Sequence, residues 1–134
     1  MSLLALASPP KDQYEYYIVF TGSFRNDVIS LSINNQAVCN KYVIENIDSN
    51  KRGHLSIAQF ENNISIAYNG RQITKSRIPV DFKLDLAITV NGKKKQFKID
   101  LKKGKVILVD FQKDPSTSQQ DLTIEQLQEP LLFY

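Results

Sequence analysis

The alternation of apolar and charged residues on either side of Asn91-Gly92 restricts the fold of this chain more than any other feature. Asn-Gly favours the positive φ angles of a two-residue turn between antiparallel strands. Closing the chain at this turn pairs apolar residues on one face and opposite charges on the other: Leu86 with Phe97, Leu84 with Ile99, Phe82 with Leu101, Asp85 with Lys98 and Lys83 with Asp100. A four-residue loop would set Asp85 against Asp100, and like charges directly opposite are destabilising. The sequence therefore predicts a tight β-hairpin in the first register.

Similar strand-and-turn patterns fill most of the chain. Asn69-Gly70 is a second hairpin turn, which would pair Ile66 with Ile73. The run 106–109 is apolar on both faces, as in a strand at the middle of a sheet. Runs of β-branched and aromatic residues predict strands at 13–20, 27–33, 36–44, 54–60, 64–68, 72–74, 82–90, 96–101 and 106–111. About seven to nine short strands joined by tight hairpins predict an all-β fold, either an antiparallel β-sandwich or a partly open barrel.

The length and composition indicate one folded domain. A chain of 134 residues, 42% hydrophobic and 23% charged, is long enough to bury a core without a disulfide. We place the β-sandwich domain at 13–111. The lead, 1–12, is either disordered or a remnant of a secretory signal peptide. Ala5-Leu6-Ala7 resembles the small-residue end of such a signal, but the basic region that should precede it is missing.

The character of the sequence changes after Phe111. Residues 112–121 are polar, contain Ser and Pro, and predict a linker. Residues 122–134 are apolar again but are interrupted by Pro130, so they form either a short helix capped by Asp121 or a strand. An exposed apolar end should dock on the protein's own sandwich or on a partner. The candidate docking residues are Leu131, Leu132, Phe133 and Tyr134.

Positive charge is concentrated in one region. The net charge is +3, but residues 82–110 carry eight lysines against three aspartates, a net of +5. The candidate polyanion or partner patch consists of Lys93, Lys94, Lys95, Lys102, Lys103 and Lys105. No surface aromatic residue is interleaved with these lysines, because Phe97 shares the core face with Ile99. We therefore do not expect nucleic-acid binding, which combines basic grooves with exposed aromatic rings.

The sequence offers no recognisable catalytic or metal site. Cys39 is the only cysteine and lies in a strand pattern, so we expect a buried, unreactive thiol. His54 is the only histidine, and no carboxylate is placed to orient it. Residues 48–59 resemble a calcium-binding loop at four positions, but Arg52 is a cation where an oxygen ligand belongs, and Gln59 replaces the bidentate glutamate. We predict a non-enzymatic protein without cofactor or metal; two carboxylates that converge in space would be the exception.

The aromatic residues suggest one further candidate site. The chain has no tryptophan, and Tyr14, Tyr16 and Tyr17 form its only aromatic cluster, a candidate ligand platform. Tyr14 and Tyr16 share a face with Ile18, which favours core packing over a sugar platform. Tyr17 would face outward or toward a second layer.

These observations leave the function open between classes. Our first hypothesis is a binding or protein-interaction module outside the cytoplasm, with a protein or a surface glycan as its partner. The alternative is a cytoplasmic structural or accessory subunit whose apolar segment 122–134 docks on another chain. Polyanion binding through the lysines is third. A homo-oligomer could form through edge strands or through the C-terminal segment, and no apolar stretch is long enough to span a membrane. The Ala5-Leu6-Ala7 motif slightly favours a periplasmic or secreted location.

Overall fold

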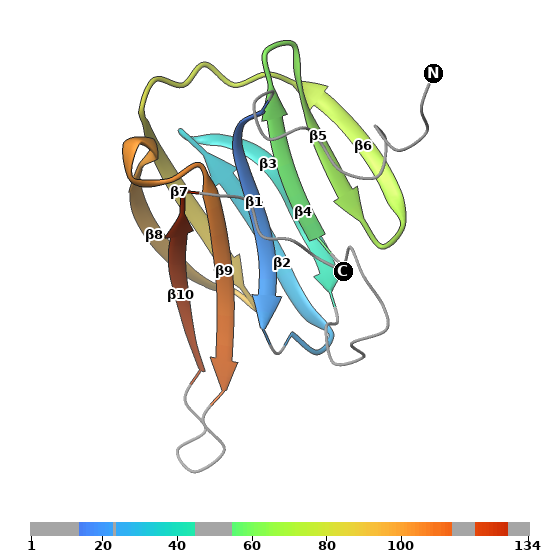
Figure 1. The fold of residues 1–134 in the computed structure, drawn as a ribbon. Helices are drawn as coiled ribbons and strands as arrows, with labels where there is room; N and C mark the ends of the chain where they lie inside the picture. Colours follow the sequence, from blue (N-terminus) through green and yellow to red (C-terminus); the bar gives the residue numbers. More distant parts are fainter. Residues whose placement is uncertain (1–13, 23, 45–54, 114–119, 129–134) are drawn as a thin grey trace.

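Ten β-strands and a short 3₁₀ helix make up the described part of this chain (Figure 1). The structure is a computed structural model that describes residues 14–22, 24–44, 55–113 and 120–128. The elements are β1 (Tyr14–Gly22), β2 (Asp27–Ile33), β3 (Gln36–Ile44), β4 (Leu55–Phe60), β5 (Asn63–Tyr68), β6 (Arg71–Ser76), β7 (Lys83–Val90), β8 (Lys93–Asp100), η2 (Leu101–Lys103), β9 (Val106–Lys113) and β10 (Gln120–Leu127).

The strands form two packed sheets, which confirms the β-sandwich; the described strands do not close into a barrel. One sheet has six strands in the order β10-β9-β1-β4-β5-β6, and the other has four in the order β3-β2-β7-β8. Among the described strands, β1 and β9 are the one parallel pair. The local pattern could not predict this pair, because seven strands separate its members along the chain.

Both predicted hairpins have the predicted register. Leu86 lies opposite Phe97, and Asp85 lies opposite Lys98. Asn91 and Gly92 have φ angles of 52° and 86°, as a type I′ turn requires. In the second hairpin, Ile66 lies opposite Ile73. Strand β9 is an interior strand between β10 and β1, as its apolar sequence predicted.

The end of the first hairpin differs from the prediction in the position of one ring. Phe82 does lie beside Leu101, whose backbone N–H donates to the Phe82 carbonyl at 2.7 Å. Leu101 is buried, but the Phe82 side chain is 60% exposed. The assignment of Phe82 to the core was therefore wrong. Strand β7 begins one residue later, at Lys83, and the chain opposite turns into η2, so this ring lies at the end of the sandwich.

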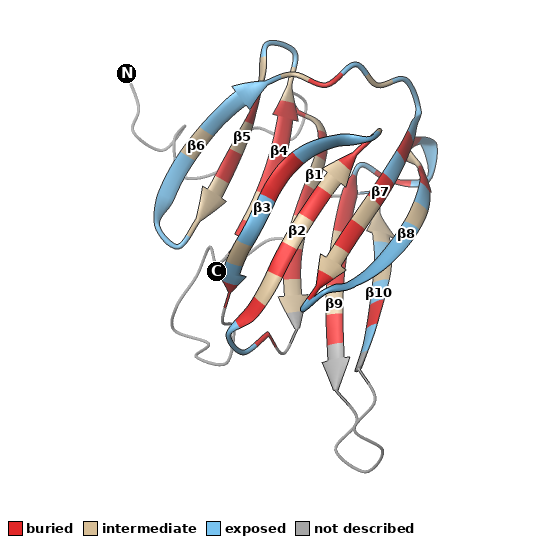
Figure 2. Cartoon of the chain, turned by 180° about the vertical axis from the view of Figure 1, so that it is seen from behind, coloured by how far each residue is buried: buried red, intermediate tan, exposed pale blue. Residues whose placement is uncertain are grey.

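The core lies between the two sheets and follows the alternation of each strand (Figure 2). In β2 every second residue is buried, beginning with Asp27. Isoleucines from both sheets fill the centre: Ile18, Ile29, Ile33, Ile57, Ile66, Ile88 and Ile107 are each fully buried. Their branched side chains pack well on a pleated surface.

The segment after Phe111 is a strand where the sequence left helix and strand open. Residues Gln120–Leu127 form β10, which pairs with β9 of the same chain. Strand β9 extends to Lys113, so the two strands take up both ends of the predicted linker 112–121. The lead 1–12 and the docking residues Leu131, Leu132, Phe133 and Tyr134 lie outside the described residues.

Side chains connect the edges of the two sheets. Near β8, the Lys95 ammonium donates to an Asp121 carboxylate oxygen at 3.0 Å and to the Leu122 carbonyl at 2.9 Å, both in β10. Near β3, the Tyr68 hydroxyl accepts from the Val43 N–H and donates to the Val43 carbonyl, both at 2.9 Å. These contacts satisfy edge groups that would otherwise face water or another chain.

Candidate functional site

The structure does not bring the six predicted lysines together. Lys93, Lys94 and Lys95 begin β8 at the hairpin turn, whereas Lys102, Lys103 and Lys105 follow its other end. Strand β8 has eight residues, and at about 3.3 Å per residue its ends are roughly 25 Å apart. The sequence cluster is therefore two groups at opposite ends of the sandwich.

Ion pairs already engage two lysines of β8. Lys95 reaches over the Phe97 ring, 5.5 Å from its centre, and its ammonium bonds Asp121. That hydrogen bond, with the lysine charge, lowers the pKa of Asp121. Lys98 lies 3.7 Å from Asp85, as predicted, although both side chains are mostly exposed. Neither lysine offers an uncompensated charge to a ligand.

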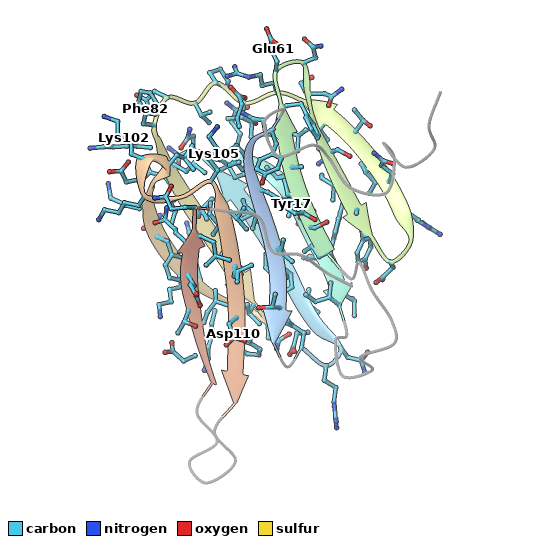
Figure 3. The ribbon with its side chains drawn as sticks, in the orientation of Figure 1. Tyr17, Glu61, Phe82, Lys102, Lys105 and Asp110 are labelled. Atoms are coloured by element: carbon cyan, nitrogen blue, oxygen red, sulfur yellow. The ribbon has the colours of Figure 1, made fainter. Side chains whose placement is uncertain are left out.

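The other group lies at the end of the sandwich that carries the exposed ring of Phe82. The Lys102 ammonium lies 4.9 Å from the centre of that ring. Figure 3 shows Phe82, Lys102 and Lys105 at the same end of the sandwich. We call this surface the lysine corner, and it comprises Phe82, Lys83, Lys102, Lys103 and Lys105.

Backbone bonds hold the lysine corner in place. An Asp100 carboxylate oxygen accepts the N–H of Lys102 at 3.0 Å and caps η2. An Asp81 oxygen accepts the N–H of Lys83, also at 3.0 Å. The carbonyl of Lys105 accepts the N–H of Tyr17 at 2.9 Å, which fixes the start of β9 against β1. These bonds position the side chains without using their ammonium groups.

The four lysines of the corner are exposed, and Lys105 acts on Glu15 only at longer range. Within the described residues, no carboxylate lies within 4 Å of the ammonium of Lys83, Lys102, Lys103 or Lys105. Asp100 lies opposite Lys83 in the hairpin, as the register predicted, but its carboxylate instead bonds the backbone of η2. The corner therefore presents four ammonium groups beside one exposed ring, and backbone N–H groups hold the nearby carboxylates of Asp81 and Asp100.

An open depression leads away from the corner along the outer face of β7 and β8. Its part nearest the corner has a volume of about 390 Å³ and is lined by Lys83, Leu84, Asp85, Lys98, Ile99 and Asp100. A smaller part of about 120 Å³ shares Asp85 and Lys98 and adds Asn35, Ala87 and Gln96. The exposed side chains here are polar and carry both signs of charge, so this surface extends the corner without adding net charge.

The predicted tyrosine platform is not formed. Tyr14 and Tyr16 are both buried. Tyr16 belongs to the core cluster, as predicted, but Tyr14 does not, because a bulge between the two residues breaks the alternation with Ile18. Tyr17 is half-buried on the outer face of the six-stranded sheet, and its ring centre lies 5.6 Å from that of Tyr14. The structure thus exposes Phe82, which the sequence placed in the core, and buries two of the three rings proposed to bind a ligand.

A polar cluster next to Tyr16 is structural. Arg77 binds both carboxylate oxygens of Glu15, at 2.7 and 2.6 Å, and this contact lowers the pKa of Glu15. Gln59 is completely buried; its amide nitrogen donates to Glu15 and to the Ile78 carbonyl, and its oxygen accepts from the Tyr16 hydroxyl. Because each of these groups already has a partner, none is poised to react.

The remaining chemical candidates offer no site within the described residues. Cys39 is buried, and burial raises the pKa of its thiol to about 12. His54 and most of the calcium-like pattern 48–59 lie outside the described residues, and Gln59 of that pattern is buried in β4. In the part of the chain that the structure describes, no three His, Cys, Asp or Glu residues group as metal ligands would.

Comparison of the sequence with protein-family models and with curated proteins finds no match, and comparison of the fold with solved structures finds none. The described residues also contain no helix with the length and hydropathy needed to cross a membrane. A function must therefore be argued from the surface of the molecule itself.

Proposed function

We propose that this domain is a non-enzymatic binding module and that it binds an acidic glycan at the lysine corner. The observation that carries this proposal is the exposed Phe82 ring beside the Lys102 ammonium, at an end of the sandwich where four exposed lysines form no ion pair among the described residues. Exposed lysines at hairpin ends also serve solubility, but an exposed large aromatic ring does not.

The magnitudes favour a ligand with several anionic groups. One ion pair at the protein surface contributes about 1 kcal/mol where the effective dielectric is close to that of water. Micromolar affinity requires about 8 kcal/mol. A single sulfate or carboxylate would therefore bind too weakly, whereas a polymer can engage the four lysines of the corner together.

The chemistry of the corner favours a glycan over a nucleic acid. Non-specific binding of single strands stacks successive bases on several aromatic rings. Within the described residues of the corner, Phe82 is the one aromatic side chain, and Lys102 already covers part of its ring. A sulfated or carboxylated sugar chain needs ammonium groups and one apolar contact, which the corner offers.

The test compares two double variants in retention on immobilised heparin. Lys102→Gln with Lys103→Gln removes two charges at the corner, and Lys93→Gln with Lys94→Gln removes two at the opposite end of β8. We expect the first variant to elute at clearly lower salt, and the second to elute with the unmodified protein. We also expect affinity to fall steeply between about 50 and 200 mM salt, as counterion release requires. Equal loss in both variants, no retention, or tighter binding to single-stranded DNA would overturn the proposal.

A further inference from the structure

The outer face of the six-stranded sheet carries an apolar strip. Ile18 of β1 and Ile107 of β9 lie side by side and point into the core. Their neighbours along each strand therefore point outward, since side chains alternate. The outward residues of β1, β9 and the end of β10 that form the strip are Tyr17, Val19, Val106, Leu108 and Leu127.

The side chains of this strip are buried or half-buried, as they would be if another segment covered them. Val106 is only 1% exposed, and Ala58, the next outward residue beyond Tyr17, is 6% exposed. The rest of the strip is partly buried. Figure 1 views the sandwich from this side, and no described strand lies in front of β1 or β9. The outer face of the opposite hairpin differs, because Asp85 and Lys98 there are exposed.

The chain itself supplies an apolar segment at the edge of the strip. Gln128 follows β10 directly, and its side-chain amide donates to the Lys103 carbonyl at 2.8 Å, which fixes the chain beside Leu127. The next proline in the sequence, Pro130, has no N–H to donate to a neighbouring strand. Four large apolar residues follow it: Leu131, Leu132, Phe133 and Tyr134.

The segment 129–134 is long enough to cross the strip. The six residues 129–134 span up to roughly 20 Å when extended. The strip crosses from β10 to β1, two steps of about 4.8 Å between neighbouring strands. A tethered segment also has an effective concentration on the order of millimolar, about a thousand times that of a separate chain at micromolar concentration. Tethering therefore favours this segment over a second copy or another protein.

We propose that Leu131 and Phe133 fold back across β9 and β1 and cover the strip on the outer face of the six-stranded sheet. This interaction occupies the surface through which the chain would otherwise bind a partner. It is independent of glycan binding, because the lysine corner and the strip use different side chains.

Thiol labelling tests this arrangement in the full chain. Val19→Cys places a reporter on the strip, and the buried Cys39 contributes little background reactivity. The matched control is Thr89→Cys, which is also partly buried but lies on the outer face of the four-stranded sheet. Each reporter is measured with and without the double substitution Leu131→Ser and Phe133→Ser, using an aromatic disulfide reagent.

We expect the double substitution to accelerate labelling of the Val19→Cys thiol about tenfold or more, as for a group that reacts only after local opening. The Thr89→Cys thiol should react at the same rate in both backgrounds. Leu108→Cys provides a second reporter if Val19→Cys perturbs folding. If the Val19→Cys thiol reacted equally fast in both backgrounds, the proposal would be overturned, and the strip would be a binding surface for another protein. Protection that is lost on dilution would also overturn it, because a second copy would then be the cover.

Discussion

The ammonium of Lys102 lies 4.9 Å from the centre of the Phe82 ring, at the point where β8 turns into η2. An exposed cation–π contact contributes about 0.5–1 kcal/mol. That is small beside the burial of a core phenylalanine, so stability alone does not explain an exposed ring here. The contact instead holds a cation and an apolar face together on the surface.

Truncating Phe82 should therefore affect binding more than stability. We expect Phe82→Ala to lower the free energy of unfolding by roughly 1 kcal/mol, because little more than the contact with Lys102 is lost. Phe24→Ala, at a completely buried ring, should cost about 3–5 kcal/mol. Urea unfolding measures both. Heparin retention should fall in Phe82→Ala, and a loss of stability equal to that of Phe24→Ala would show that Phe82 belongs to the core.

Two glycines with positive φ should respond differently to alanine. At Gly92 a Cβ would meet nothing within 4 Å, so the cost comes from the φ of +86° alone, about 1–2 kcal/mol. At Gly104, with φ of +153°, a Cβ would lie 2.5 Å from the Leu127 carbonyl oxygen. Gly104→Ala must displace the end of β10 as well, so we expect the larger loss in urea unfolding. It should also speed amide hydrogen exchange in β10, and equal losses in the two variants would contradict this reading.

The sequence predicted those features of the fold that depend on residues close together in the chain. The register around Asn91-Gly92 follows from pairs within one hairpin, and it was correct. The parallel pairing of β1 with β9 depends on strands far apart in sequence, and no local pattern encodes it. Alternation placed Phe82 in the core, because alternation does not show where the opposite sheet ends. The preceding Asp81, which caps the start of β7 through the N–H of Lys83, was the available signal.

The predicted lysine patch also depends on contacts between residues far apart in the sequence. Lys95 is close to the other lysines in sequence, but its partner Asp121 comes from β10, which the sequence left open between helix and strand. Which lysines are neutralised therefore depends on strand order. Counting charges along the chain could not separate the corner from the opposite end of β8.

Acid should weaken the fold partly through Glu15. The hydrogen bond from Arg77, helped by Gln59, lowers the pKa of Glu15 below its ordinary value of 4.5. A carboxyl whose pKa is lower in the folded state stabilises the fold fully above the unfolded value. That contribution is lost as the pH falls below 4.5 and through the folded-state pKa.

The Glu15→Gln variant isolates this effect. We expect a lower thermal midpoint than that of the unmodified protein at neutral pH, and a smaller further decline below pH 4.5. Asp85→Asn is the control, because the pair of Asp85 with Lys98 is exposed and such pairs contribute little. Parallel curves for Glu15→Gln and the unmodified protein would show that the contact with Arg77 does not govern acid stability.

Substitutions of Lys95 and Lys102 should distinguish a lysine that stabilises the fold from a lysine that binds the glycan. Lys95→Met keeps the aliphatic stem but removes the hydrogen bonds to Asp121 and Leu122 that join the two sheets. We expect a loss of about 1 kcal/mol in urea unfolding, the usual net value of such a bond, and no change for Lys94→Met, for which the described residues show no ion pair. Because Lys95 lies near the opposite end of β8 from the corner, Lys95→Met should elute from heparin with the unmodified protein. Lys102→Gln should elute earlier, and it should lose no more stability than the roughly 0.5–1 kcal/mol of its contact with the Phe82 ring. If Lys95→Met eluted as early as Lys102→Gln, the ligand would lie along β8, and the binding surface would have to be moved from the corner to that strand.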